Sequence, residues 1–335
     1  MNKKEMLEGV KEAINRDGVF PYEWGRDKPL SDQLCLTGYT LAAMCLLGEI
    51  ALAKKLMDGL LLMEKLTFKQ GYLPRCIYYG AKEFDYIKKT TKGMGKKDVG
   101  IWNDTSQDQY VGLFFGLHFA EKSKDKWLNN TACGLEDRVR MRLNLDKMKI
   151  KNEDGKTCKH GKLNRFFQHI FFPYMKWTWR DKLTLKLMPL MKLQDTLKRI
   201  MGKRLNRSNF HMILCGLYLI CQYKSEFKKH YKAVFNHVKK EDNALFNAMF
   251  NSLTGKDKPV REIVATMPDK CQYISKSDII ERDYIVPVED RPFSHWQWKE
   301  DVYMEQADNA EYTNRYGTHA DGLLALAIQN KGIEI

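Results

Sequence analysis

Residues 102–108 combine the side chains that carbohydrate chemistry uses. Asp104 and Asp108 stand four positions apart, a spacing that puts two side chains on one face of a helix. A pair of carboxylates supplies the general acid and base that cleave a glycosidic bond. Trp102 and Asn103 come just before them, and an indole stacks on a sugar ring while an amide binds its hydroxyls. The segment therefore predicts a catalytic role for Asp104 and Asp108 and a substrate-binding role for Trp102 and Asn103.

Helix capping explains the same carboxylates without any chemistry. Thr105-x-x-Asp108 is similar to a capping box with Asp in place of Glu, and Asp in a first turn complements the helix dipole. Two further helices are expected to begin with an aspartate among similar polar residues, at Ser31-Asp32-Gln33 and at residues 318–322. Capping and function both stay open at all three places.

A second group of aromatic and polar side chains lies near the C-terminus. It consists of His295, Trp296, Arg315, Tyr316, His319 and Asp321. Tyrosine and histidine act as base and acid in β-elimination from uronic acids, and arginine neutralises the uronate carboxylate. We therefore expect Tyr316 and His319 to be catalytic and the other four to bind substrate. The alternative is packing, with the tryptophan as a core residue and His319 as a cap.

Two more residues are expected to bind substrate from loops beside the first helical hairpin. Trp24 lies in the aromatic and polar stretch 20–27, which precedes that hairpin as residues 102–103 precede the next one. Arg75 lies where the chain returns from the hairpin. If the hairpins close into a ring, these loops line one mouth of it.

Helical periodicity dominates the elements that must position these residues. Apolar side chains at helical spacing predict helices over residues 32–47, 50–66, 105–120, 208–223, 225–239, 242–253, 260–265 and 318–330. The short turns between them predict antiparallel hairpins. Strand patterns are few, at 72–79 and 284–288, and residues 88–100 are expected to form a loop. The chain is therefore predicted to be all-α with short β pieces.

Serial helical hairpins with aspartate-rich starts resemble the six-hairpin (α/α) toroid superfamily. The resemblance rests on Asp104-Thr105-Ser106-Gln107-Asp108-Gln109 and on residues 293–298 and 319–327, and it covers the chain outside 147–207. It implies a single toroid domain over residues 1–335. It also implies carbohydrate-directed chemistry of the glycoside hydrolase, polysaccharide lyase or isomerase kind, or a degenerate binding cavity.

Positive charge is concentrated in one segment of the chain. Fifty-six Lys and Arg against 42 Asp and Glu give a net charge of +14, and residues 147–207 account for +13 of it. We interpret 147–207 as a basic insert rich in aromatic residues and leucine. Three interpretations stay open for it: packing on the fold, docking on an anionic membrane surface, and, with less support, binding of nucleic acid or an acidic polymer. The alternative to a carbohydrate-active protein is therefore a non-catalytic interaction protein that docks on an anionic membrane or a polyanion through residues 147–207.

Several classes of protein and site have no support in the sequence. Residues 1–10 have no apolar stretch typical of a signal peptide, and no run of 18 apolar residues is present, so we expect a cytoplasmic protein, peripheral at a membrane if the insert docks there. Eight cysteines without a CxxC motif are typical of a reduced protein. Cys158-x-His160 lacks a second ligand pair, and neither GxGxxG, a P-loop nor HExxH occurs, so we expect no metal and no cofactor.

Overall fold

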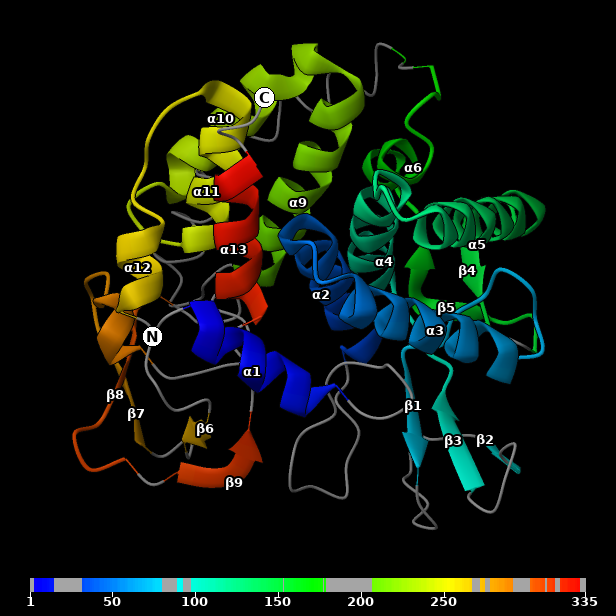
Figure 1. Ribbon diagram of the computed structural model, residues 1–335, viewed down its shortest axis with the longest axis horizontal. Helices are drawn as coiled ribbons and strands as arrows, with labels where there is room; N and C mark the ends of the chain where they lie inside the picture. The colour runs from blue at the N-terminus through cyan, green and yellow to red at the C-terminus, as the bar shows by residue number, and fades with distance from the viewer. Residues whose placement is uncertain are drawn as a thin grey trace. The chain divides into compact units, whose positions relative to one another are not determined.

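Two compact units make up the chain. The computed structural model describes residues 3–14, 32–79, 89–92, 98–152, 154–176, 178, 207–266, 272–274, 278–291, 302–310, 312–316 and 320–331. Residues 11–172 form unit 2, and residues 1–10 with 173–335 form unit 1. Helices predominate (Figure 1), which confirms the all-α prediction with short β pieces. The toroid and the single domain over residues 1–335 stay predictions.

Unit 2 is built on two consecutive helical hairpins. Its helices are α2 (Gln33–Leu47), α3 (Ile50–Leu66), α4 (Gln107–Glu121), α5 (Lys126–Leu145) and the short α6 (Arg165–Phe171). Gly48 ends α2 in the left-handed conformation, with φ at 77°, and its N–H bonds to the carbonyls of the last turn. Because α3 begins two residues later, α2 and α3 form the antiparallel hairpin that the sequence predicts.

Helices α2 and α4 run side by side in the same direction at very short distance. A Cβ atom at Gly38 would stand 2.0 Å from the carbonyl oxygen of Gly112, and one at Gly116 would stand 2.4 Å from the carbonyl oxygen of Gly38. Backbone therefore touches backbone, which only glycine allows. Both helices are buried around most of their circumference, so they carry the core of unit 2. Their parallel course brings their N-terminal ends together.

A three-stranded antiparallel sheet leads into α4. Its strands are β1 (Cys76–Tyr79), β2 (Lys89–Lys92) and β3 (Asp98–Trp102), in the order β1-β3-β2. The register pairs Cys76 with Trp102, so Arg75 and Trp102 come together at the end of the sheet. The prediction of a loop over residues 88–100 is wrong where β2 and β3 form. Pairing with β1 supplies the third strand that a short Lys/Thr hairpin needs for stability.

The first part of the predicted basic insert belongs to the core of unit 2. Strands β4 (Lys149–Lys151) and β5 (Thr157–Lys162) form an antiparallel hairpin, and α6 follows. Phe171 is fully buried and stacks on Phe114 of α4, with ring centroids 4.5 Å apart. The boundary between the two units falls at residues 172 and 173, inside the insert. Packing on the fold is therefore the correct interpretation for the aromatic residues 166–171.

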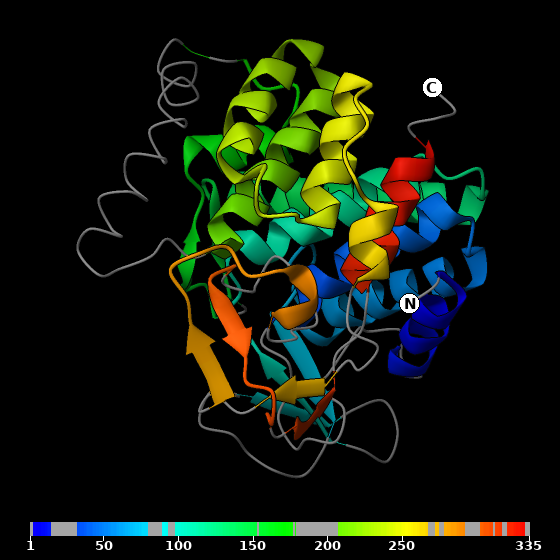
Figure 2. The same ribbon diagram turned by 90° about the vertical axis from the view of Figure 1, so that its left-hand side faces the viewer.

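Unit 1 repeats the pattern of hairpins with buried helices. Its helices are α9 (Arg207–Tyr223), the 3-10 turn η2 (Ser225–Phe227), α10 (Lys228–Val238), α11 (Ala244–Thr254), α12 (Arg261–Ala265) and α13 (Ala320–Lys331). Figures 1 and 2 show α13 beside α11. Phe235 of α10 stacks on Phe250 of α11, with centroids 4.1 Å apart. Asn251 of α11 donates to Gln329 of α13 at 2.9 Å, which joins these two helices near their C-terminal ends.

Short strands complete unit 1, and one helix crosses the boundary between the units. The pairs are β6 (Gln272–Ile274) with β9 (Tyr312–Tyr316), and β7 (Ile279–Glu281) with β8 (Met304–Gln306); the 3-10 turn η4 covers Val288–Asp290. The strand predicted at 284–288 does not form, because Arg282 N–H and Val286 N–H each bond to the chain at 302–303 outside a regular ladder. Helix α1 (Lys3–Ala13) has residues in both units. Among the described helices, none has the length and apolarity needed to cross a membrane.

Candidate functional site

Arg75 is the centre of a cluster at the N-terminal ends of α2 and α4. Its Nη2 lies 3.0 Å from Oδ1 of Asp32, and its Nη1 donates to Oγ of Ser106 at 3.3 Å. The guanidinium also lies over the indole of Trp102, with its carbon 5.1 Å from the ring centroid. A guanidinium held by stacking and by a carboxylate has a fixed orientation. Arg75 therefore lies beside Trp102, and the substrate-binding role of both stays a prediction.

Asp32 ties the two helices together instead of capping its own helix. Its side chain makes no capping bond to α2. Oδ1 accepts from Nε2 of Gln109 at 2.8 Å, and Gln109 Oε1 accepts from the N–H of Cys35 at 3.1 Å. The first turn of α2 is therefore capped by a side chain of α4. The interpretation of Asp32 as a local cap is wrong, because α4 lies close enough to take over that role.

Asp104 and Asp108 do not share a helical face. Helix α4 begins at Gln107, with Ser106 as its N-cap, so Asp104 precedes the helix and four-residue spacing does not apply to it. Asp104 Oδ1 accepts from the N–H of Lys159 on β5 at 2.7 Å. Asp108 Oδ1 accepts from the hydroxyl of Ser106, which also contacts Arg75. Asp104 fastens the β4–β5 hairpin, whereas Asp108 faces the Arg75 cluster.

The capping box expected at Thr105-x-x-Asp108 does not form. Ser106, not Thr105, is the N-cap, and its side chain makes no capping bond because its hydroxyl donates to Asp108. Within the described part of the chain, Oγ1 of buried Thr105 has no hydrogen-bond partner, and neither do Oδ1 of Asn103 and Oε1 of Gln107. Among the described residues, these three buried oxygen atoms therefore lack the donors that buried acceptors ordinarily have.

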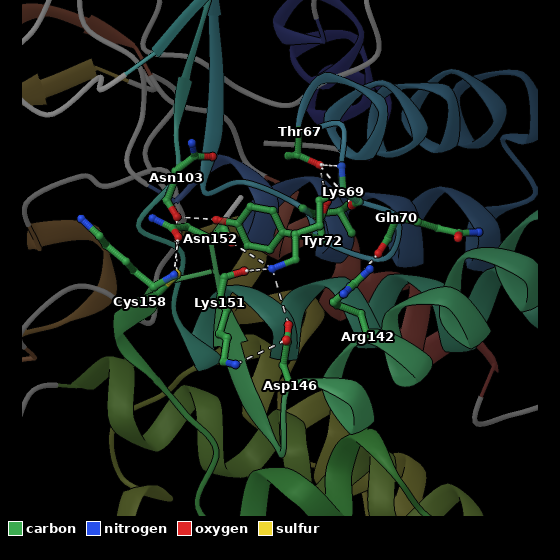
Figure 3. A network of polar contacts seen from close by, with 12 residues as sticks. Thr67, Lys69, Gln70, Tyr72, Asn103, Arg142, Asp146, Lys151, Asn152 and Cys158 are labelled. Carbon is green, nitrogen blue, oxygen red and sulfur yellow. Dashed lines mark hydrogen bonds and ion pairs between the residues drawn. The ribbon is translucent and has the colours of Figure 1, made fainter. Parts of the chain in front are cut away.

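A polar network behind the segment holds Asn103 in place (Figure 3). The carbonyl oxygen of Asn103 accepts from the hydroxyl of Tyr72 and from Sγ of Cys158, which is 3.4 Å away. Lys69 lies beside the ring of Tyr72 and donates to the carbonyl of Asn152 at 2.8 Å. Burial lowers the pKa of Lys69, and Asp146, 3.5 Å away, opposes that change. No motif in the sequence points to Lys69 or Tyr72 as site residues, although both lie next to the predicted return from the first hairpin.

The buried thiols near this segment are not nucleophiles. Burial raises the pKa of Cys76 to about 12 and also raises that of Cys158. A thiol with a raised pKa is protonated at neutral pH and does not attack a substrate. Among the residues that the structure describes, no three His, Cys, Asp or Glu side chains form a group that could hold a metal ion. The reactive and binding groups at the N-terminal ends of α2 and α4 are therefore carboxylates, a guanidinium and an indole.

The structure gathers some predicted site residues and leaves others outside its description. The structure brings Arg75, Trp102 and Asp108 together in unit 2, Asp108 through Ser106. Asn103 and Asp104 are next to them in the chain, and Asp104 bonds to β5. Trp24, His295, Trp296 and His319 lie outside the described residues, and for Arg315 and Tyr316 only the course of the backbone in β9 is described. Asp321, in the first turn of α13, is buried in unit 1 and accepts from the N–H of Gly322.

Unit 1 contains a cavity of about 320 Å³, and the residues that line it differ in kind from those of the Arg75 cluster. Its lining consists of Lys3, Arg261, Val264, Leu326 and Asn330. These described lining residues include no carboxylate, so they do not suit acid/base cleavage of a glycosidic bond. They also include none of the predicted site residues.

We expect substitution of Arg75 to show that the cluster acts as a unit. Arg75→Met removes the ion pair with partly buried Asp32 and the stack on Trp102, so the free energy of unfolding should fall by about 1–3 kcal/mol. Asp32→Asn should cost a similar amount, and the double variant should cost less than the sum. Urea unfolding of the four proteins measures this coupling. Strictly additive losses would show that the two side chains act independently.

Comparison with known proteins gives no relative for this chain. No family model, no curated protein and no solved structure matches it. Its function must therefore be argued from the geometry of unit 2.

Proposed function

We propose that the N-terminal ends of α2 and α4 form a carbohydrate-directed site, of the glycoside hydrolase or lyase type or retained as a binding site. The observation that carries the proposal is the convergence of Arg75, Trp102, Ser106 and Asp108 from the start of β1, the end of β3 and the start of α4. An indole, a guanidinium and carboxylates are the groups that hold a sugar ring and its hydroxyl or carboxylate substituents. The sugar-binding surface would be the part of the Trp102 indole that Arg75 leaves uncovered.

Asp108 is the carboxylate best suited to general acid/base chemistry. Asp32 is neutralised by Arg75, and Asp104 is engaged by the backbone of β5. Asp108 is partly exposed, and its hydrogen bond is to a hydroxyl, that of Ser106. A serine hydroxyl can rotate toward another acceptor, so Asp108 can release it when a substrate hydroxyl or glycosidic oxygen arrives.

A glycan screen followed by product analysis tests this function. The purified protein is applied to an array of neutral and acidic glycans, and each bound glycan is then incubated with it. New reducing ends without an unsaturated product identify a hydrolase, an unsaturated uronate that absorbs in the ultraviolet identifies a lyase, and binding without a product identifies a binding protein. Absence of binding to every neutral and acidic glycan would overturn the proposal.

The alternative function is that of a non-catalytic protein that docks on an anionic membrane, and only part of the predicted insert is still able to dock. Residues 166–171 lie in the core of unit 2, so docking through the predicted insert would use the basic residues of 147–165, of which Lys156, Lys159 and Lys162 are exposed, or residues 173–207. Co-sedimentation with anionic and with neutral vesicles tests this alternative. Binding to anionic vesicles alone would support it, and equal absence from both pellets would eliminate it.

A further inference from the structure

A buried carboxyl group lies between α4 and α5, the two helices of the second hairpin of unit 2. Glu136 of α5 is 3% exposed. Its Oε1 is in contact with Nη2 of Arg140, one turn further along α5. Its Oε2 is buried and has no donor among the described residues. A buried carboxylate oxygen without a donor is costly, so this arrangement needs an explanation.

The neighbour of Glu136 across the hairpin is a second carboxyl group. Glu121 is the last residue of α4, and its side chain lies within hydrogen-bonding reach of that of Glu136. Two ionised carboxylates have no hydrogen to share, because each is an acceptor only. If one proton is present, Oε2 of Glu136 becomes a donor, and both carboxyl groups then have a hydrogen-bond partner. Glu121 also stands at the negative end of the α4 dipole, which disfavours a second negative charge there.

The charged groups around the pair do not supply enough positive charge to hold two carboxylates. Arg140 is the cation beside Glu136, and it is shared with the carbonyl of Phe171 at 2.8 Å and the ring of Phe114. Asp137 adds a negative charge on α5, and Cys133 on α5 and His118 on α4 are the other titratable groups nearby in the chain. Two charged groups of α3 face α5: Glu64 is already paired with Arg138 at 2.7 Å, and Lys54 is paired with Asp125 at 2.7 Å and lies over the ring of Trp127.

We propose that buried Glu136 keeps its proton at neutral pH, with the side chain of Glu121 as the acceptor, and that this shared proton makes the packing of α4 on α5 sensitive to pH. Burial and Glu121 together raise the pKa of Glu136 to about 9, and Arg140 opposes them. Between the ordinary pKa of a glutamic acid and about 9, the folded unit keeps a proton that the unfolded chain releases. The contribution of the pair to stability is therefore fully present below the ordinary pKa and is lost as the pH rises through the folded value. This inference does not depend on the proposed carbohydrate site.

Glu136→Gln tests the shared proton, because glutamine has nearly the same shape and carries its own donor. The urea midpoint of the wild type, measured relative to that of Glu136→Gln, should fall as the pH rises from about 5 to about 9. Asp58→Asn, at an exposed position of α3, is the control, and its midpoint should change with pH in parallel with that of the wild type. A wild-type midpoint that keeps a constant difference from Glu136→Gln over this range would overturn the proposal.

Infrared spectroscopy gives a second readout that does not depend on stability. The folded wild type at neutral pH should show the carbonyl band of a protonated carboxylic acid, and Glu136→Gln should lack it. If Glu136→Gln does not fold, Glu121→Gln should also remove the band, since its amide donates to Glu136 and no shared proton is needed. A wild type without the band, or a band that survives in the folded variant, would overturn the proposal.

Discussion

Gly38→Ala is expected to cost unit 2 at least about 3 kcal/mol of its free energy of unfolding. The added Cβ would stand 2.0 Å from the carbonyl oxygen of Gly112 and 2.8 Å from the amide nitrogen of Leu113. Both are backbone atoms of α4, so no side chain can move aside. Relief requires α2 and α4 to separate, which opens the helix contact around which unit 2 is built.

Gly134→Ala is the matched control for the glycine contact. Gly134 lies inside α5 of the same unit, and its added Cβ would meet only Nη1 of Arg138, at 3.5 Å. Alanine is the better helix former, so this variant should gain about 0.5–1 kcal/mol. Urea unfolding followed by circular dichroism measures both variants. A Gly38→Ala protein within about 1 kcal/mol of the wild type would show that the helices are not in backbone contact.

Asp108→Asn is expected to lower turnover of the glycan found by screening by about 10²–10⁴-fold, the usual contribution of a general acid or base. Asparagine keeps the shape and can still accept from Ser106, so the fold should be retained. The reaction should lose one limb of its pH–rate profile, which a merely structural role would leave in place. The measurement is kcat/KM on that glycan over a range of pH.

Asp104→Asn is the comparison that separates chemistry from scaffolding. Asp104 accepts from the backbone of Lys159, and asparagine can accept the same bond. Turnover should therefore fall less than about 10-fold, with an unchanged pH profile. If Asp104→Asn loses turnover and Asp108→Asn keeps it, the assignment of roles to the two carboxylates is reversed.

Helical periodicity predicted most elements because their apolar faces are continuous. Helices α2, α3 and α9 begin and end within one residue of the expected positions. Helix α5 was missed because its composition is polar, although Leu128, Ala132, Leu135, Val139 and Leu143 recur at helical spacing and are buried. That repeat is the signal that would have found it.

The candidate site was predictable in residue type but not in geometry. The position of Trp102 and Arg75 in the chain shows that both are near a hairpin, but the register of β1 with β3 decides that they stack. The two carboxylates were expected on one helical face because the start of α4 was placed too early, at Thr105 instead of Gln107. The links from α4 to Asp32 and Cys35 depend on the glycine contact, and a long-range contact of that kind has no local pattern.

The affinity of Trp102→Ala for a glycan tests the carbohydrate site most directly. Trp127 of the same unit is the matched control, since it is 40% exposed on α5 and also has a cation, Lys54, over its ring. The wild type and Trp127→Ala should bind the screened glycan equally, and Trp102→Ala should bind it at least about 10-fold more weakly while unit 2 stays folded. Equal binding by all three proteins, or binding of no glycan by the wild type, would contradict the account.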